Sequence, residues 1–188
     1  MTRKTKPFWQ IEMAAENMLK HCSCYDKPYE YIDFMIESCK IDIIPLDVDP
    51  DKLLGVFGKD KNDYKFIGFN KNMITERILF TKAHELGHFI LEHNLKGEFL
   101  TDDSFKSKDP QETEANIFAA ALLMPKQAVF EVIKSILGDS HGSISNPPSI
   151  TYEELSTQEK YNLTNAMKNK FHTSDESIYW RLYNLVKK

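Results

Sequence analysis

The spacing of apolar residues along this 188-residue chain predicts an α+β fold in which helices dominate. Apolar positions recur at helical spacing in two N-terminal segments, 8–20 and 28–39. Short apolar runs bounded by polar or turn-forming residues predict three strands, at 41–48, 53–58 and 64–70. Pro45 indicates that the first strand lies at an edge or an end of the sheet, because proline has no amide proton for a central ladder.

The second half of the chain is predicted to be helical. Its apolar pattern and its helix-start and helix-stop residues predict helices at 75–93, 110–124, 126–137, 152–170 and from 174 onwards. Asp109, followed by Pro110, is a suitable N-cap for the second of these helices. The sequences TYEE at 151–154 and TSDE at 173–176 are capping boxes for the last two.

A stretch rich in glycine, serine, asparagine and proline interrupts the helical pattern at 138–150. Such a composition without hydrophobic periodicity is typical of a linker. The sequence therefore predicts a main domain over 1–137, a linker over 138–150 and a helical C-terminal region over 151–188.

Composition and charge narrow the function classes. Hydrophobic residues make up 41% of the chain and charged residues 28%, as in an ordinary soluble globular protein. The net charge of −4 argues against a mainly electrostatic nucleic-acid binder. No apolar run approaches the roughly 20 residues that span a bilayer, and the N-terminus lacks the apolar core of a signal peptide. We therefore expect a cytoplasmic protein without membrane association.

The three cysteines, Cys22, Cys24 and Cys39, are an odd number and cannot form a closed disulfide framework. A metal site that combines them with His21 is an alternative, but their spacing matches none of the common zinc patterns. Ordinary reduced cysteines are the favoured interpretation.

The stretch FTKAHELGHFILEH at 80–93 carries the candidate chemistry. His84 and His88 are four residues apart, so on a helix both side chains leave one face and can reach a single zinc ion. Glu85 points about 100° round the helix, where it can contact a zinc-bound water as a general base. The alternative is an amphipathic helix whose histidines are surface or packed residues.

A catalytic zinc ion usually takes three protein ligands. Glu112 and Asn116 are four residues apart and share a helix face, so Glu112 could bind the zinc while Asn116 hydrogen-bonds a ligand histidine. Glu114 points about 200° away from Glu112 and cannot share that role. Alternatively, Glu112 completes a capping box with Asp109. The neighbouring His–Glu–His helix favours the ligand role.

These motifs resemble a known family. FIGFN, RILFTKAHELGHFILEH and ETEANIFAAALLMP, over about residues 64–126, resemble the ImmA/IrrE family of zinc-dependent metallopeptidases. The resemblance implies a zincin-like, specifically gluzincin-like, main domain: an active-site helix, a small antiparallel sheet beside it, and a second helix that bears a glutamate ligand. It also implies that His84, His88 and Glu112 bind Zn²⁺ and that Glu85 is the catalytic base.

The resemblance also implies a class of substrate. Members of the family commonly cleave or inactivate a helix-turn-helix transcriptional repressor, which derepresses genes of a phage, a mobile element or a stress response. We therefore expect a zinc-dependent endopeptidase with such a repressor as substrate. The alternatives are a non-proteolytic regulator that displaces a repressor and a toxin–antitoxin component. The sequence does not specify the oligomeric state.

A zincin-like domain leads us to expect two further features, one for substrate binding and one for catalysis. An extended substrate is expected to add as a strand to an exposed sheet edge, for which the 64–70 strand is the candidate. The transition state also needs a donor for its oxyanion. The candidates are His93, Tyr64, His141 and Tyr152, and their spacing does not distinguish among them. By its helical position His93 suits a packed or surface histidine.

The C-terminal region resembles the helix-turn-helix-like tail of many of these proteins. It has a modest basic bias, from Lys168, Lys170, Arg181, Lys187 and Lys188. Direct nucleic-acid binding is not favoured, because the whole chain is acidic and a helical pair is usually a packing unit. Docking of the repressor is the better interpretation. The aromatic residues Tyr179, Trp180 and Tyr183 suit either such docking or closure of the core.

Overall fold

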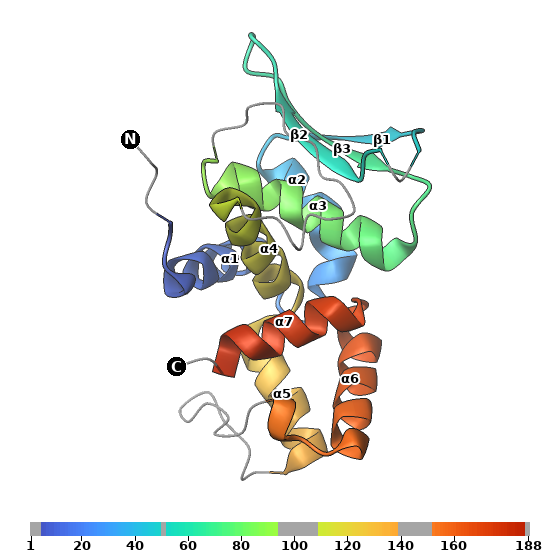
Figure 1. Ribbon diagram of the computed structural model, residues 1–188. Coiled ribbons are helices and arrows are strands. Elements are labelled where there is room, and N and C mark those ends of the chain that lie inside the picture. Colours follow the sequence, from blue (N-terminus) through green and yellow to red (C-terminus); the bar gives the residue numbers. More distant parts are fainter. Residues whose placement is uncertain (1–4, 50–51, 94–108, 139–151, 187–188) are drawn as a thin grey trace.

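The computed structural model describes residues 5–49, 52–93, 109–138 and 152–186, and it confirms the α+β class (Figure 1). These residues form seven α-helices, two 3-10 helices and one three-stranded sheet. The elements are α1 (Phe8–Cys22), η1 (Pro28–Tyr31), α2 (Ile32–Ser38), β1 (Asp42–Leu46), β2 (Gly55–Lys59), β3 (Lys65–Asn70), α3 (Thr75–Ile90), α4 (Pro110–Leu123), α5 (Lys126–Leu137), η4 (Tyr152–Glu154), α6 (Thr157–Phe171) and α7 (Asp175–Val186). The sheet lies at one end of the molecule, α3 and α4 cross at its centre, and α5, α6 and α7 lie at the other end (Figure 1).

The sheet is mixed rather than purely antiparallel, because β1 pairs with β3 in parallel while β2 pairs with β3 in antiparallel orientation. The strand order is β1-β3-β2, so β3 is central. The prediction that the 64–70 strand is the exposed edge is therefore wrong, whereas Pro45 does lie on an edge strand, β1. β3 is central because the connection between β1 and β2 crosses the end of β3, so that β1 and β2 lie on its two sides. Asn70 is fully buried there, and its side chain donates to the carbonyls of Val48 and Leu53.

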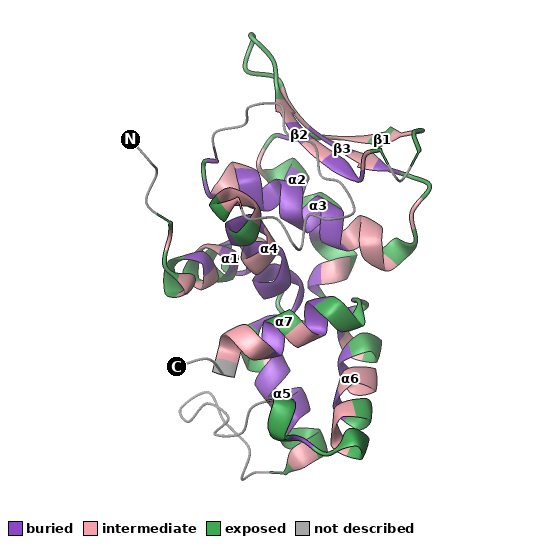
Figure 2. Cartoon of the chain, viewed as in Figure 1, coloured by how far each residue is buried: buried purple, intermediate pink, exposed green. Residues whose placement is uncertain are grey.

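The helices α3 and α4 form the centre of the fold, and most of their surface is buried (Figure 2). α3 contacts β2, β3 and α2 as well as α4. The close α3–α4 crossing depends on Gly87, since a Cβ there would lie 3.0 Å from Cδ1 of Phe118. α4 also contacts α1 and α7, so it has neighbours on several sides. This explains why apolar residues fill the whole circumference of α4 from Phe118 onward.

The helix α3 ends three residues earlier than the sequence predicts. Its last residue is Ile90, and Glu92 adopts a left-handed backbone conformation with φ 54°. The amide of Glu92 donates to the Phe89 carbonyl at 3.0 Å, and the amide of His93 donates to the His88 carbonyl at 2.9 Å. This pair of bonds is a Schellman motif, and it turns the chain back toward the helix.

The C-terminal helices pack against the rest of the molecule, with Leu163, Met167, Phe171, Ile178 and Leu182 in the common apolar core. Thr151 lies outside the described residues, as does most of the predicted linker.

The two C-terminal helices start at caps other than the predicted ones. The box that opens α6 is Ser156 with Glu159. The hydroxyl of Ser174 accepts the amide of Ser177, so the N-terminal cap of α7 lies one residue later than the predicted Thr173. In both cases a serine near the predicted position makes the cap.

Cys22, Cys24 and Cys39 are free thiols, as predicted. Burial raises the pKa of both Cys24 and Cys39, which keeps these thiols protonated. The cysteines are absent from the one group of converging metal-binding side chains found among the described residues.

Within the described ranges no single helix is both long and apolar enough to cross a bilayer; the pair α4 and α5, bent by 63°, meets that criterion only when taken together.

Candidate metal centre

The side chains of His84, His88 and Glu112 converge between α3 and α4. One ligand atom from each lies within 4.8 Å of the other two. Nε2 of His84 is 2.8 Å from Nε2 of His88, and 3.1 Å from Oε2 of Glu112. Nε2 of His88 is 3.4 Å from Oε1 of Glu112. The three side chains that the sequence singles out as ligand candidates therefore lie together, and Glu112 faces the histidines although it also lies in the first turn of α4.

Asn116 contacts a candidate ligand, as its spacing from Glu112 predicts. Its Oδ1 lies 2.7 Å from Nδ1 of His84. An amide oxygen only accepts, so Nδ1 of His84 carries the proton and Nε2 presents a lone pair to the centre. Burial lowers the pKa of His84, which favours this neutral form. Asp109 caps α4 by accepting the amide of Gln111.

Glu85 lies beside this group and is also buried. Its carboxylate accepts a hydrogen bond from the backbone of Phe57 in β2, while Oε1 has no partner within the described parts of the chain. Burial, with a smaller contribution from the charge of Glu112, raises its pKa to about 8. Gly55 makes this approach of β2 possible, because a Cβ there would lie 2.3 Å from Cγ2 of Thr81 and 3.1 Å from Oε1 of Glu85.

The donor set fits a zinc ion. Lone pairs as close as the two Nε2 atoms repel one another unless a cation lies between them. Burial opposes ionisation of Glu112, but the neighbouring His84 and His88 outweigh burial and lower its pKa, so it is a carboxylate. Its Oε2 is buried yet forms no hydrogen bond among the described residues, although Nε2 of His84 is near. Two imidazole nitrogens and one carboxylate are a common ligand set of catalytic zinc.

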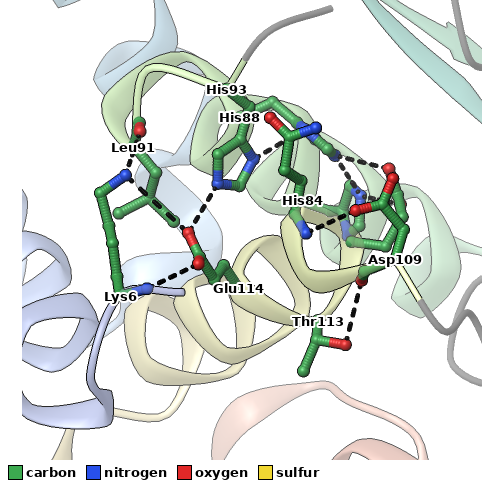
Figure 3. Close-up of polar contacts among 10 residues, drawn as sticks. Lys6, His84, His88, Leu91, His93, Asp109, Thr113 and Glu114 are labelled. Carbon is green, nitrogen blue, oxygen red and sulfur yellow. Dashed lines mark hydrogen bonds and ion pairs between the residues drawn. The ribbon is translucent and has the colours of Figure 1, made fainter. Parts of the chain in front are cut away.

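The contacts of two residues beside the centre, His93 and Glu114, were not predicted from the sequence. His93 lies with its Nδ1 2.9 Å from Nδ1 of His88, and its Nε2 is 3.0 Å from Oε2 of Glu114 (Figure 3). A helical wheel could not place His93, because α3 has already ended and the Schellman turn folds the residue back. Glu114 does point away from Glu112, as predicted, but toward this second histidine.

The three candidate oxyanion donors that the structure describes contact other groups. His93 is engaged by His88 and Glu114. The hydroxyl of Tyr64 interacts with Asp42, and that of Tyr152 lies 3.0 Å from the hydroxyl of Thr164. His141 lies outside the described residues.

The fold and the converging donor set define a protein of the metallopeptidase type, and comparison with known proteins gives the same class. The model of the family Peptidase_M78, the IrrE N-terminal-like domain, matches residues 36–141. The chain belongs to this family, which confirms the resemblance to the ImmA/IrrE proteins. The matched range includes β1 to α5 and all four residues of the candidate centre.

A curated relative comes from a phage. The chain is 31% identical over 130 residues to "Uncharacterized immunity region protein 2" of Bacillus phage phi105. The aligned part covers 69% of this chain and 78% of the relative. The similarity thus extends beyond the motif helices.

Proposed function

We propose that this protein is a zinc-dependent endopeptidase that cleaves a helix-turn-helix transcriptional repressor. One observation carries the peptidase part. Glu85, a buried carboxyl group with one oxygen that has no partner among the described residues, lies beside the His84–His88–Glu112 group, whose donor atoms converge. A general base next to an open metal centre is the arrangement that peptide hydrolysis by a zinc enzyme requires.

His84, His88 and Glu112 would hold the ion in this mechanism. Zinc, when bound, supplies a Lewis acid for the peptide carbonyl, and its charge favours the ionised form of Glu85. Glu85 takes the proton from the attacking water and then passes it to the leaving amine. The backbone amide of Phe57 fixes the Glu85 carboxylate during both transfers.

The outer edge of β2 is the proposed substrate edge, in place of β3. The amide of Asp60 donates to the Tyr64 carbonyl and that of Asn70 to the Leu54 carbonyl, so the even-numbered residues of β2 face β3. Alternation then turns the backbone groups of residues 55, 57 and 59 outward. The Phe57 amide reaches Glu85 on that side. An extended peptide that pairs with this edge would lie beside the catalytic base.

A repressor substrate is supported by two observations. The phage relative is named for an immunity region, and the chain belongs to the IrrE-like family. The aromatic rings of Tyr152, Tyr179, Trp180 and Tyr183 contact one another on η4 and α7, with Trp180 exposed. This aromatic cluster is the proposed docking surface for the repressor.

Direct binding of nucleic acid is not part of the proposal. Three basic residues of the described C-terminal helices have acidic partners: Lys168 pairs with Asp175, Lys170 with Glu131, and Arg181 with Glu12. A fourth, Lys160, donates to the Glu153 carbonyl. Little uncompensated positive charge remains there for a phosphate backbone.

The test is whether the purified protein cleaves a candidate helix-turn-helix repressor chosen from the genes beside its own. Wild-type protein with zinc should give two fragments, whereas Glu85→Gln should slow cleavage about 10²–10⁴-fold and keep its zinc. Cleavage by Glu85→Gln at the wild-type rate would refute the role of the base. A stable complex of fixed ratio without fragments would instead favour a displacing regulator or a toxin–antitoxin component.

A further inference from the structure

We infer that His93 and Glu114 are positioning residues that fix the tautomer and the orientation of the ligand His88. This inference rests on the proposed zinc site and concerns two residues that the proposed mechanism does not use. Four groups follow one another in space, from the N-terminal segment to the centre: the Lys6 amide, Glu114, His93 and His88 (Figure 3).

The hydrogen bonds determine where the protons lie. The Glu114 carboxylate only accepts, so Nε2 of His93 donates to it across 3.0 Å. In the neutral imidazole of His93, Nδ1 is then the acceptor. The contact of 2.9 Å between the two Nδ1 atoms therefore requires that His88 donates its Nδ1 proton. As a consequence, Nε2 of His88 has a lone pair, and this atom faces His84 and Glu112.

Glu114 and His93 are deeply buried, which indicates that their hydrogen bonds are needed. Glu114 and His93 retain 2% and 7% of their exposure. Polar groups buried to this degree are costly unless their hydrogen bonds are made, and an apolar pair of similar volume would fill the space at lower cost. His93 reaches its place only through the left-handed conformation of Glu92, which is uncommon for a glutamate.

We call this series of hydrogen-bonded groups, from Glu114 through His93 to His88, the relay. Lys6 fixes its outer end. Its backbone amide donates to Oε1 of Glu114 at 2.7 Å, and its ammonium group lies 3.8 Å from Oε2. The same ammonium group donates to the Leu91 carbonyl at 2.6 Å, next to the Schellman turn. The N-terminal segment thus holds both the carboxylate and the turn that carries His93.

The two ligand histidines are consequently held by different means. His84 donates to a neutral amide, Asn116, whereas His88 donates to a histidine that is itself bonded to a carboxylate. A chain that ends on a carboxylate raises the basicity of the ligand nitrogen more than an amide does.

The experiment compares His93→Leu with His93→Asn. Leucine removes the acceptor, and zinc affinity should fall about 10–100-fold in chelator competition. The asparagine oxygen occupies nearly the position of Nδ1 and can still accept from His88, so this variant should recover most of the affinity. The zinc affinity of Glu114→Gln should lie between those of His93→Leu and His93→Asn. His21→Leu, the same change at an exposed histidine, is the matched control and should bind zinc like the wild type.

The absorption spectrum of the cobalt-substituted protein gives a readout besides activity. His93→Leu and Glu114→Gln should shift or weaken the visible bands, because the His88 ring is no longer held, whereas His93→Asn should keep the wild-type spectrum. Circular dichroism of the metal-free proteins checks the fold. If His93→Leu does not fold, Glu114→Gln decides the matter.

The outcomes separate the two ideas. Wild-type affinity and an unchanged cobalt spectrum in the folded leucine and glutamine variants would overturn the positioning role while leaving the zinc site intact. Absence of zinc binding in the wild type would overturn the proposed function and the relay with it. Loss in His93→Leu with recovery in His93→Asn would support the relay.

Discussion

Two buried polar clusters hold distant parts of this chain together, and they differ in how far their hydrogen bonds are satisfied. The centre between α3 and α4 contains Glu85 and Glu112, each with one buried oxygen that forms no hydrogen bond among the described residues. The second cluster, here called the anchor cluster, consists of Arg181 of α7, Glu12 of α1 and the Met124 carbonyl. Arg181 is 1% exposed and bonds to both oxygens of Glu12 and, at 3.0 Å, to that carbonyl.

The difference indicates what each cluster does. In the anchor cluster the positive guanidinium of Arg181 meets a carboxylate and a carbonyl, so its charge is compensated and the cluster attaches α7 to α1 and to the end of α4. The α3–α4 centre gathers two imidazole lone pairs and the Glu112 carboxylate, which repel one another, so it is incomplete without a cation. Among the described residues, unsatisfied buried carboxyl oxygens, rather than buried charge as such, distinguish the candidate site from the anchor cluster.

Removal of a ligand should have the largest effect. His84→Ala or His88→Ala takes one of three protein donors away, and the zinc content of the purified protein should fall to background in metal analysis. Cleavage should disappear with it, whereas the metal-free fold should persist because a mutual repulsion is also removed. His21→Ala serves as control, and a wild-type zinc stoichiometry in either ligand variant would disprove the assignment.

Disruption of the anchor cluster should instead lower the stability of the fold and leave zinc binding unchanged. Arg181→Met leaves Glu12 without its partner, and the free energy of unfolding should decrease by about 3 kcal/mol in urea titration. The zinc content of the molecules that remain folded should not change. Adding Glu12→Gln should restore part of the stability, because the unpaired charge is gone. A loss of zinc in folded Arg181→Met would remove the distinction between the clusters.

The pH dependence of the metal-free protein provides the third test. Because the pKa of Glu85 is raised from 4.5 to about 8, the unfolded chain releases this proton at lower pH than the folded one. The stability contributed by the neutral carboxyl is therefore complete below about pH 4.5 and is lost as the pH rises through about 8. Glu85→Gln does not titrate, so its stability relative to wild type should grow over this range in thermal melts.

Saturating zinc should reduce that pH dependence, because the cation favours the ionised carboxylate. A constant difference in melting temperature between Glu85→Gln and wild type from pH 5 to pH 9, without metal, would contradict the buried environment of Glu85.

The smallest effect is expected where the sheet meets the centre. Gly55→Ala places a methyl group on Thr81 and against Glu85, so β2 must move outward, at a cost of about 1–3 kcal/mol. Cleavage should slow while zinc affinity stays the same. Thr81→Ser removes the Cγ2 atom that the new Cβ would meet, and the double variant should recover activity. If Thr81→Ser brings no recovery, the clash is not the cause.

Much of the fold and most of the candidate centre could be predicted from the sequence, since both depend on local periodicity. The helices and strands follow from apolar spacing, and the convergence of His84 with His88 needs only an α-helix. The prediction of the edge strand was wrong because strand order depends on the path of the β1–β2 connection. Asn70 holds that connection through hydrogen bonds to two carbonyls that are distant in the sequence.

The sequence by itself determined that His84 and His88 share one helix face with Glu85 beside them, and that Glu112 shares a face with Asn116, because each of these placements follows from the pitch of one helix. The tertiary structure alone decided the surroundings of these residues. His93 reaches His88 because the helix ends in a left-handed turn, which is formed by Glu92 and not by a glycine that the sequence would reveal. Glu114 contacts Lys6, which lies 108 residues earlier in the chain. Such contacts depend on how separate elements pack, and periodicity along one segment carries no information about its partners.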